Sequence, residues 1–324
     1  MAIGPDTAPA NAMSMIKLLL PLLFLLPNGA RAAQPAFNLE SVTLRVLLEL
    51  PVPFSPAVSV PLRADPQPEE KYFNAYILKA IDHLYKNYGL LGYDINSILT
   101  HDITYNTFGV IPARHAPLTM CVAAQMEIIL TAYEIYAKET GDLSVYYYLP
   151  KRSFEGLAIT DLKGHIWVNH EFNADGTADA LINFGMGERR LFENLKPGDF
   201  VNINRTTRTG HAVAFIGYIN KAGKVLPKYD ASVVGFKYFS SQGRLAAGEG
   251  GFDYRYAVFS KFGCPEMPYK RDCNVIYSAD QTYLNTGTML SPKYWTGVKP
   301  QASGEAAGET VLNRGFFNGI TTDD

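Results

Sequence analysis

Cys121 is the residue best suited to nucleophilic chemistry. Pro117 blocks a helix before it, Thr119 is a suitable N-cap, and an apolar periodicity begins near Met120, so we expect a helix to begin here. The amide groups and the dipole at a helix start favour negative charge, which lowers a thiol pKa and increases the thiolate fraction. The alternative is a buried, inert cysteine, because residues 122–124 are small and apolar.

The other two cysteines indicate an oxidising compartment. Cys264 and Cys273 lie nine positions apart, with turn-forming residues between them. In an exported protein this pattern predicts a local disulfide, and the alternative is two unrelated thiols. The pairing leaves Cys121 as the odd cysteine, which is then a candidate reactive thiol.

His211 is the histidine best placed to act as the base. It follows Thr209 and Gly210 and opens the apolar strand predicted over 211–219. A histidine at the mouth of a strand lies at the end of a sheet, where binding and catalytic sites commonly form. The alternative is an ordinary surface histidine.

A third polar group is needed to orient the imidazole. If strands 211–219 and 233–242 pair as an antiparallel hairpin, the end of the second strand lies beside His211. Gln242 is favoured there, because its amide oxygen can accept a ring N–H. Ser240 is the second choice and Asp230, in the connecting loop, the third. The ordinary polarity of strand ends explains all three as well.

Three further residues are candidates for the substrate cleft. They are His101, which is next to Asp102, Tyr105 as a substrate contact or oxyanion donor, and His115, six positions before Cys121. A solvated loop is the alternative for His101 and Tyr105. His165 and His170, next to Glu171, invite a metal interpretation, but on a strand their five-residue offset sends the rings to opposite faces. We therefore predict no metal site and no cofactor.

The elements that must position these residues follow an α-then-β order. Helical periodicity predicts helices over 72–85, 120–138 and 178–184, with Gly89 and Gly141 ending the first two. Alternating or β-branched segments predict strands over 144–149, 156–161, 166–168, 199–204, 211–219, 233–242 and 252–259. This order predicts an α+β fold in which N-terminal helices pack on an antiparallel sheet.

The chain ends differ in character from its middle. Lys17, the apolar run 18–26 and the small-x-small triplet 30–32 predict a signal peptide over 1–33, cleaved near Ala32, with Met13 or Met15 as a more ordinary start. The run is too short for a membrane span, so we expect a periplasmic or secreted protein. Residues 34–70 form a predicted proline-rich arm, 71–295 the catalytic domain, and 296–324 a mobile tail.

Composition narrows the classes of partner. The chain has 324 residues and a formal net charge of only -2. Nucleic-acid binding requires a basic patch or stripe, and the near balance of charge offers none. The balance does not favour binding to an anionic membrane surface either.

Three segments together resemble a known superfamily. Thr119-Met-Cys-Val-Ala123, Lys196-Pro-Gly-Asp-Phe-Val201 and Gly210-His-Ala-Val-Ala-Phe-Ile-Gly217 are similar to the cysteine helix and two core strands of NlpC-type and CHAP-type papain-like cysteine hydrolases. The resemblance covers about residues 100–260. The Asp-Cys-Ser-Gly sequence around the nucleophile is absent, and 90 positions separate Cys121 from His211. The chain is therefore closer to the superfamily than to either named family.

The resemblance implies an exported amidase or endopeptidase that cuts peptide or amide bonds through an acyl-enzyme. Bacterial cell-wall peptides are the substrate that the resemblance and the predicted export imply. The alternatives are a non-catalytic envelope binding or structural protein on the same fold and a transglutaminase-like acyltransferase. The acyltransferase would use the same residues as the hydrolase. In the hydrolase water attacks the acyl-enzyme, whereas in the acyltransferase an amine does.

Overall fold

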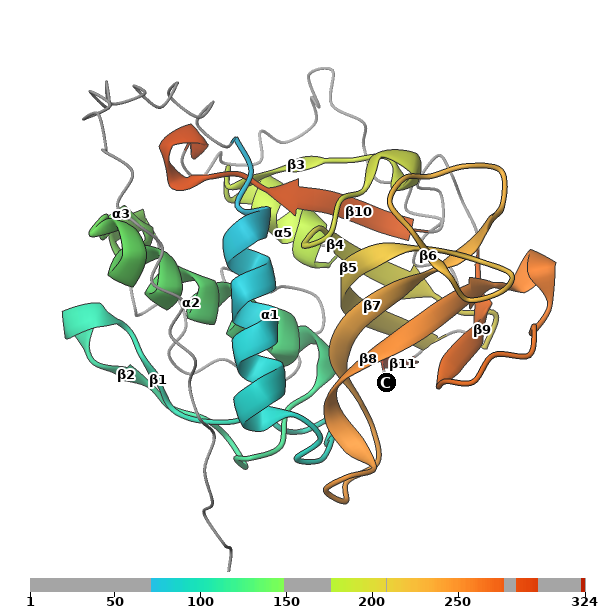
Figure 1. The fold of residues 1–324 in the computed structure, drawn as a ribbon. Helices are drawn as coiled ribbons and strands as arrows, with labels where there is room; N and C mark the ends of the chain where they lie inside the picture. Colours follow the sequence, from blue (N-terminus) through green and yellow to red (C-terminus); the bar gives the residue numbers. More distant parts are fainter. Residues whose placement is uncertain (1–70, 149–175, 208, 277–283, 297–321, 324) are drawn as a thin grey trace, which may run out of the picture. The chain divides into compact units, whose positions relative to one another are not determined.

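The computed structural model describes residues 71–148, 176–207, 209–276, 284–296 and 322–323, which belong to one compact unit, Arg63–Asp324. The unit is an α+β fold with a large, mostly antiparallel sheet and a few helices (Figure 1), as the order of the elements predicts. The predicted signal peptide, the proline-rich arm, strands 156–161 and 166–168, and all of the predicted tail except residues 296 and 322–323 lie outside the described residues.

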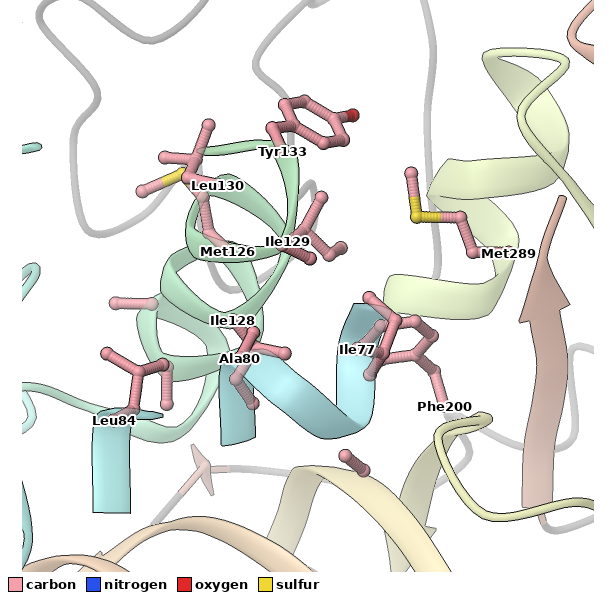
Figure 2. Close-up of a cluster of buried hydrophobic side chains, with 14 of the residues drawn as sticks. Ile77, Ala80, Leu84, Met126, Ile128, Ile129, Leu130, Tyr133, Phe200 and Met289 are labelled. Atoms are coloured by element: carbon pink, nitrogen blue, oxygen red, sulfur yellow. The ribbon is translucent and has the colours of Figure 1, made fainter. Parts of the chain in front are cut away.

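Two helices supply the α layer beside the sheet. Helix α1, Asn74–Tyr88, ends at Gly89, and helix α2, Cys121–Thr140, ends at Gly141 in the left-handed conformation. Every residue of α2 from Cys121 to Tyr133 is buried, because α2 packs against both α1 and the sheet. Figure 2 shows the apolar cluster in which side chains of the two helices lie near Phe200 and Met289 of the sheet layer.

The segment predicted as a strand over 144–149 is wrong in type, since α3, Ser144–Tyr148, is a one-turn helix. Asp142 Oδ1 accepts a hydrogen bond from the Ser144 amide at 2.9 Å, which supports a helix start. Tyr146 then packs edge-on against Tyr105, with ring centroids 5.0 Å apart. Capping and tertiary packing here override the β propensity of an aromatic run. Helix α5, Thr177–Asn183, confirms the short helix predicted over 178–184.

The large sheet has the order β3-β10-β4-β5-β7-β8-β9, and β6 and β11 also pair with β5. Most pairs are antiparallel, whereas β8–β9 and β5–β11 are parallel. The strands are β3 Gly187–Arg189, β4 Phe200–Asn204, β5 Thr209–Asn220, β6 Val225–Leu226, β7 Val233–Gly243, β8 Gly250–Phe259, β9 Arg271–Val275, β10 Leu284–Met289 and β11 Thr322–Asp323. Strands β1, Ile103–Thr104, and β2, Val110–Ile111, form a separate antiparallel pair.

The sheet is apolar on both faces. Successive side chains of a strand point to opposite sides, and the consecutive residues 212–215 of β5 are all apolar. Ala212 and Ala214 of β5 belong to the cluster that includes α1 and α2. Val213 and Phe215 belong to a second cluster on the other face. The small alanines let α2 approach β5 closely. In the part of the chain that the structure describes, none of the helices is long and apolar enough to cross a lipid bilayer.

Cys264 and Cys273 form a disulfide, as the nine-residue spacing predicts. Cys264 lies in the loop that follows β8, and Cys273 lies in β9. Because β8 and β9 are parallel neighbours, a crossover connection must join them. The disulfide links this connection, at Cys264, to β9, at Cys273.

A buried carboxylate holds the turn that leads into β4. Asp199 Oδ2 accepts a hydrogen bond from the Lys196 amide at 2.7 Å, and Asp199 Oδ1 accepts one from Asn74 Nδ2 at 2.8 Å. Arg190 Nε lies 3.5 Å from Asp199 Oδ2. Burial raises the pKa of Asp199, and the Arg190 charge and the hydrogen bonds offset only part of this rise.

This raised pKa predicts a specific pH dependence of stability. The folded state retains a proton on Asp199 at pH values where the unfolded state has lost it, so the contribution is fully present below the ordinary pKa of 3.8 and is lost as pH rises through the folded value. Relative to Asp199→Asn, the wild-type unfolding free energy should therefore fall as pH rises from about 4 to 7, by about 1.4 kcal/mol per unit of pKa difference. Urea unfolding of both proteins across this range measures the effect, and parallel pH profiles would contradict it.

Candidate active site

Cys121 is the first residue of α2. The N-cap is Met120, in extended conformation (φ -105°, ψ 170°), and no side chain among the described residues caps the helix start. The predicted N-cap, Thr119, is therefore wrong by one residue. Its carbonyl accepts a hydrogen bond from Ser241 Oγ at 2.9 Å, and its own hydroxyl is buried without a hydrogen-bond partner in the described structure. The segment before Cys121 is thus fixed to β7, and the first-turn amides are not occupied by a cap.

His211 and Gln242 meet as the hairpin argument predicts. Strands β5 and β7 pair antiparallel, and His211 Nε2 lies 3.1 Å from Gln242 Oε1. Gln242 Nε2 donates to the Asp253 carbonyl at 3.2 Å, so its amide oxygen faces the ring. An amide oxygen only accepts, so Nε2 carries the proton and Nδ1 of the neutral ring keeps the lone pair. The contact therefore selects the tautomer in which Nδ1 is the base.

Both candidate reacting groups are buried. Cys121 is 0% exposed and His211 is 1% exposed. The edge of the His211 ring packs against Tyr238, with centroids 5.6 Å apart and planes at 73°. Burial strengthens any charge interaction between a thiolate and an imidazolium. It also means that a substrate reaches the sulfur only if neighbouring groups move.

Gln125, one helical turn after Cys121, connects the two candidates. Its side-chain nitrogen Nε2 lies 3.4 Å from the Cys121 carbonyl oxygen and 3.1 Å from the Ala212 carbonyl oxygen. The two carbonyl oxygens are therefore no further apart than the sum of these distances. Since Ala212 directly follows His211, the backbone at the nucleophile candidate lies beside the backbone at the base candidate.

The backbone pairing of β5 with β7 ends close to the candidate site. The β5–β7 ladder ends at Ala214↔Phe239, before it reaches His211. His211 is opposite Ile203, whose side chain belongs to the cluster on the sheet face away from α2, whereas Cys121 belongs to the cluster that contains α2. Beyond the end of the ladder, Gln125 of α2 contacts both strands, through the Ala212 carbonyl of β5 and Ser240 Oγ of β7.

The other two candidates for the third residue have different contacts. Ser240 Oγ donates to the Ala212 carbonyl at 2.6 Å and accepts from Gln125 Nε2 at 3.3 Å. Asp230 lies before the start of β7, at the opposite end of that strand from Gln242, and it accepts hydrogen bonds from Ser232. Of the three, Gln242 is the residue placed against the His211 ring.

His101 lies on a different side of α2. Its Nδ1 is 3.2 Å from Oε1 of the buried Glu127, and its ring stacks on Tyr88 with centroids 4.1 Å apart. Positions 125 and 127 are about 200° apart around a helix, so Glu127 points away from the side on which Gln125 meets β5. His101 lines a separate cavity of about 330 Å³ together with His83, Tyr88, Asp102, Ile103, Thr104, Thr131, Glu134, Ile135 and Lys138.

Tyr105 and His115 are also not gathered around Cys121 by the contacts that the structure shows. Tyr105 is a core residue, 1% exposed, packed on Tyr146, and burial raises its pKa. His115 is exposed in the loop before α2, in the left-handed region (φ 62°), and its carbonyl accepts from the Leu118 amide. The burial of Tyr105 reflects packing by α3, which sequence periodicity missed.

Two buried polar residues in contact with the segments that carry Cys121 and His211, Gln125 and Ser241, were not among the sequence candidates. A signal for Gln125 exists in retrospect, because it is a polar residue at i+4 from Cys121 within an apolar helical stretch, and such residues share one helix face. Within the described residues, no three His, Cys, Asp or Glu side chains form a group that could hold a metal ion. His165, His170 and Glu171 lie outside those residues.

Comparison of the chain with protein-family models, with curated proteins and with solved structures gave no match.

Proposed function

We propose that this protein is an exported cysteine amidase or endopeptidase with a papain-like fold, in which Cys121 is the nucleophile, His211 the general base and Gln242 the residue that orients the imidazole. The observation that carries the proposal is the hydrogen bond between His211 Nε2 and Gln242 Oε1. This bond leaves Nδ1 as the basic nitrogen of His211. His211 directly precedes Ala212, and the carbonyls of Ala212 and Cys121 both lie within hydrogen-bond distance of Gln125 Nε2.

The chemistry follows from these roles. His211 Nδ1 takes the thiol proton, and the Cys121 thiolate attacks the carbonyl carbon of an amide. The C–N bond then breaks, the leaving amine takes the proton from the imidazolium, and a thioester remains on Cys121. His211 next takes a proton from water, whose oxygen attacks the thioester, and the carboxylic acid leaves as the thiol is restored. The amides of the first turn of α2 can stabilise the oxyanion that forms in each step.

The substrate class rests on two further expectations. The similarity of segments 119–123, 196–201 and 210–217 to NlpC-type and CHAP-type hydrolases implies an amide bond in peptidoglycan. The predicted signal peptide and the Cys264–Cys273 disulfide suit a protein that meets the cell wall in an oxidising compartment. We therefore propose stem peptides of the bacterial cell wall as the substrate.

The burial of Cys121 and His211 favours a second candidate, a non-catalytic envelope protein on the same fold. In that protein the thiol is a small apolar core group, and the His211–Gln242 bond only satisfies two buried polar side chains. A transglutaminase-like acyltransferase shares the proposed residues, and the products of the reaction separate it from a hydrolase.

Alkylation of the native protein with iodoacetamide tests the proposal. The chain has three cysteines, and the disulfide occupies two of them, so under non-reducing conditions one added carbamidomethyl group reports on Cys121. An activated thiol should react readily at about pH 6, well below the ordinary thiol pKa of about 8.5. Intact-protein mass spectrometry against time at each pH gives the rates.

The non-catalytic alternative makes the opposite prediction. In that case, native protein remains unlabelled from about pH 5 to 9, while urea-unfolded protein is labelled at the rate of an ordinary thiol. This result would rule out Cys121 as an activated nucleophile. The unfolded sample serves as the control that the thiol is intact and available.

A further inference from the structure

The side-chain amide of Gln125 is in contact with three elements of the candidate active site. Nε2 lies 3.4 Å from the Cys121 carbonyl in α2, 3.1 Å from the Ala212 carbonyl in β5 and 3.3 Å from Ser240 Oγ in β7. Gln125 is 0% exposed. A single buried NH₂ group thus touches the residue of the nucleophile, the neighbour of the base, and the strand that carries the orienting residue.

The Ala212 carbonyl oxygen of β5 requires a hydrogen-bond donor from outside the β5–β7 ladder. Because the β5–β7 ladder stops at Ala214↔Phe239, the Ala212 carbonyl has no ladder partner on β7. Ser240 Oγ and Gln125 Nε2 fill that position. Buried backbone oxygens are normally satisfied in this way. Ser241 completes the arrangement by donating to the Thr119 carbonyl, two residues before Cys121.

Stability alone does not explain a glutamine here. Gln125 Oε1 is buried with no hydrogen-bond partner among the described residues, and an unmet buried acceptor is destabilising. The Ala212 carbonyl would still accept from Ser240 if Gln125 were absent. A methionine has the same length and no unmet oxygen, so it suits a core position in this part of α2 better.

We propose that Gln125 is a positioning residue, whose amide ties the first turn of α2 to β5 and β7 and thereby fixes the Cys121 sulfur relative to the His211 ring. This inference rests on the proposed function. The hydrogen bonds of Gln125 beyond the end of the β5–β7 ladder set where α2 begins relative to His211, and Ser240 is the partner through which β7 takes part. Directional polar contacts of this kind specify one arrangement, whereas apolar packing tolerates small shifts.

Gln125→Met tests the proposal, because it removes the tie and keeps the volume. Displacing a reacting group by about 1 Å can reduce the rate about 10²-fold. We expect kcat on purified cell-wall sacculi to fall by about this factor with little change in KM. The reactivity of Cys121 with iodoacetamide at about pH 6 should also fall, because the rate should then follow the ordinary thiol pKa of about 8.5. Thermal unfolding should change little.

Glu127→Gln is the matched control on the same helix. Glu127 is also 0% exposed, but it binds the Thr100 amide at 2.9 Å, on the side of α2 away from β5. Its substitution should lower the thermal stability and leave the pH profile of Cys121 alkylation unchanged. Ser240→Ala should act in the same direction as Gln125→Met but more weakly, because it removes the contact to β7 and leaves Gln125 Nε2 3.1 Å from the Ala212 carbonyl. The double variant should show less than the product of the two single effects, because both substitutions remove the Gln125–Ser240 contact. Ser240→Thr, which keeps the hydroxyl, should restore the profile.

The outcomes separate this inference from the proposed function. If wild-type Cys121 is reactive at about pH 6 and Gln125→Met has the same profile, the positioning role is wrong and the proposed chemistry stands. If wild-type Cys121 is inert in the native protein, the proposed function fails first, and the inference fails with it. If Gln125→Met does not fold, Gln125→Leu decides, because it also removes all three contacts of Nε2 and an unchanged profile in that variant overturns the positioning role.

Discussion

Replacement of Cys121 by alanine is expected to abolish turnover of purified cell-wall sacculi while the protein remains folded. Without the sulfur no thioester can form, and we expect the rate to fall by about 10³-fold or more. The structural cost is small, because the change removes one buried sulfur, comparable to a methylene at about 1 kcal/mol. Release of soluble peptide fragments measures the activity, and circular dichroism with thermal unfolding measures the fold.

Val122→Ala is the matched control for this prediction. Val122 is the next residue of α2 and is also buried, so its truncation disturbs the packing at the same helical turn without touching the thiol. It should lower the unfolding temperature at least as much as Cys121→Ala and retain most of the activity. Undiminished digestion of sacculi by Cys121→Ala would remove Cys121 from the mechanism. Equal loss in both variants would indicate that packing, not the nucleophile, explains the effect.

The elements near the candidate site were predictable because their signals are local. Gly89 and Gly141 end the two long helices where expected. Gly141 takes the left-handed conformation that favours glycine at a helix end, and a Cβ at Gly89 would lie 2.4 Å from the Tyr85 carbonyl oxygen, so both signals are local. The strands β4, β5, β7 and β8 follow from regular alternation, and the contact between His211 and Gln242 follows from the pairing of two of them. In an antiparallel hairpin, the residues that face each other follow from the positions of two strands that are close in the sequence.

What the sequence did not show depends on tertiary contacts. Tyr105 and His101 are polar or aromatic residues near the expected cleft, but α3 covers the first and buried Glu127 holds the second on another side of α2. Neither partner is adjacent in the sequence. The end of the β5–β7 ladder, beyond which Gln125 contacts the Ala212 carbonyl, is likewise a property of the tertiary structure. Hydrophobic pattern fixes which face of a strand is buried, but not where its pairing ends.

Replacement of His211 by glutamine is the second decisive test, because it removes the base and can keep the hydrogen bond. Glutamine Nε2 lies as many bonds from Cα as the ring Nε2 and can donate to Gln242 Oε1, so the buried acceptor that His211 satisfies at 3.1 Å need not be left unmet. General-base catalysis contributes about 10²- to 10⁴-fold, and we expect kcat on sacculi to fall within that range. His83→Gln, at an exposed position of α1, should retain full activity.

The pH dependence makes the His211 test specific. With the imidazole present, Nδ1 can hold the thiol proton, so a thiolate is available where an isolated thiol is protonated. In His211→Gln the rate of Cys121 alkylation should therefore be low at about pH 6 and rise only towards the ordinary thiol pKa of about 8.5. A profile that still shows rapid alkylation at about pH 6 would mean that the helix start or another group activates the sulfur. Because the glutamine variant keeps Cys121 and its helix intact, the lost low-pH reactivity can be assigned to proton transfer between the two side chains.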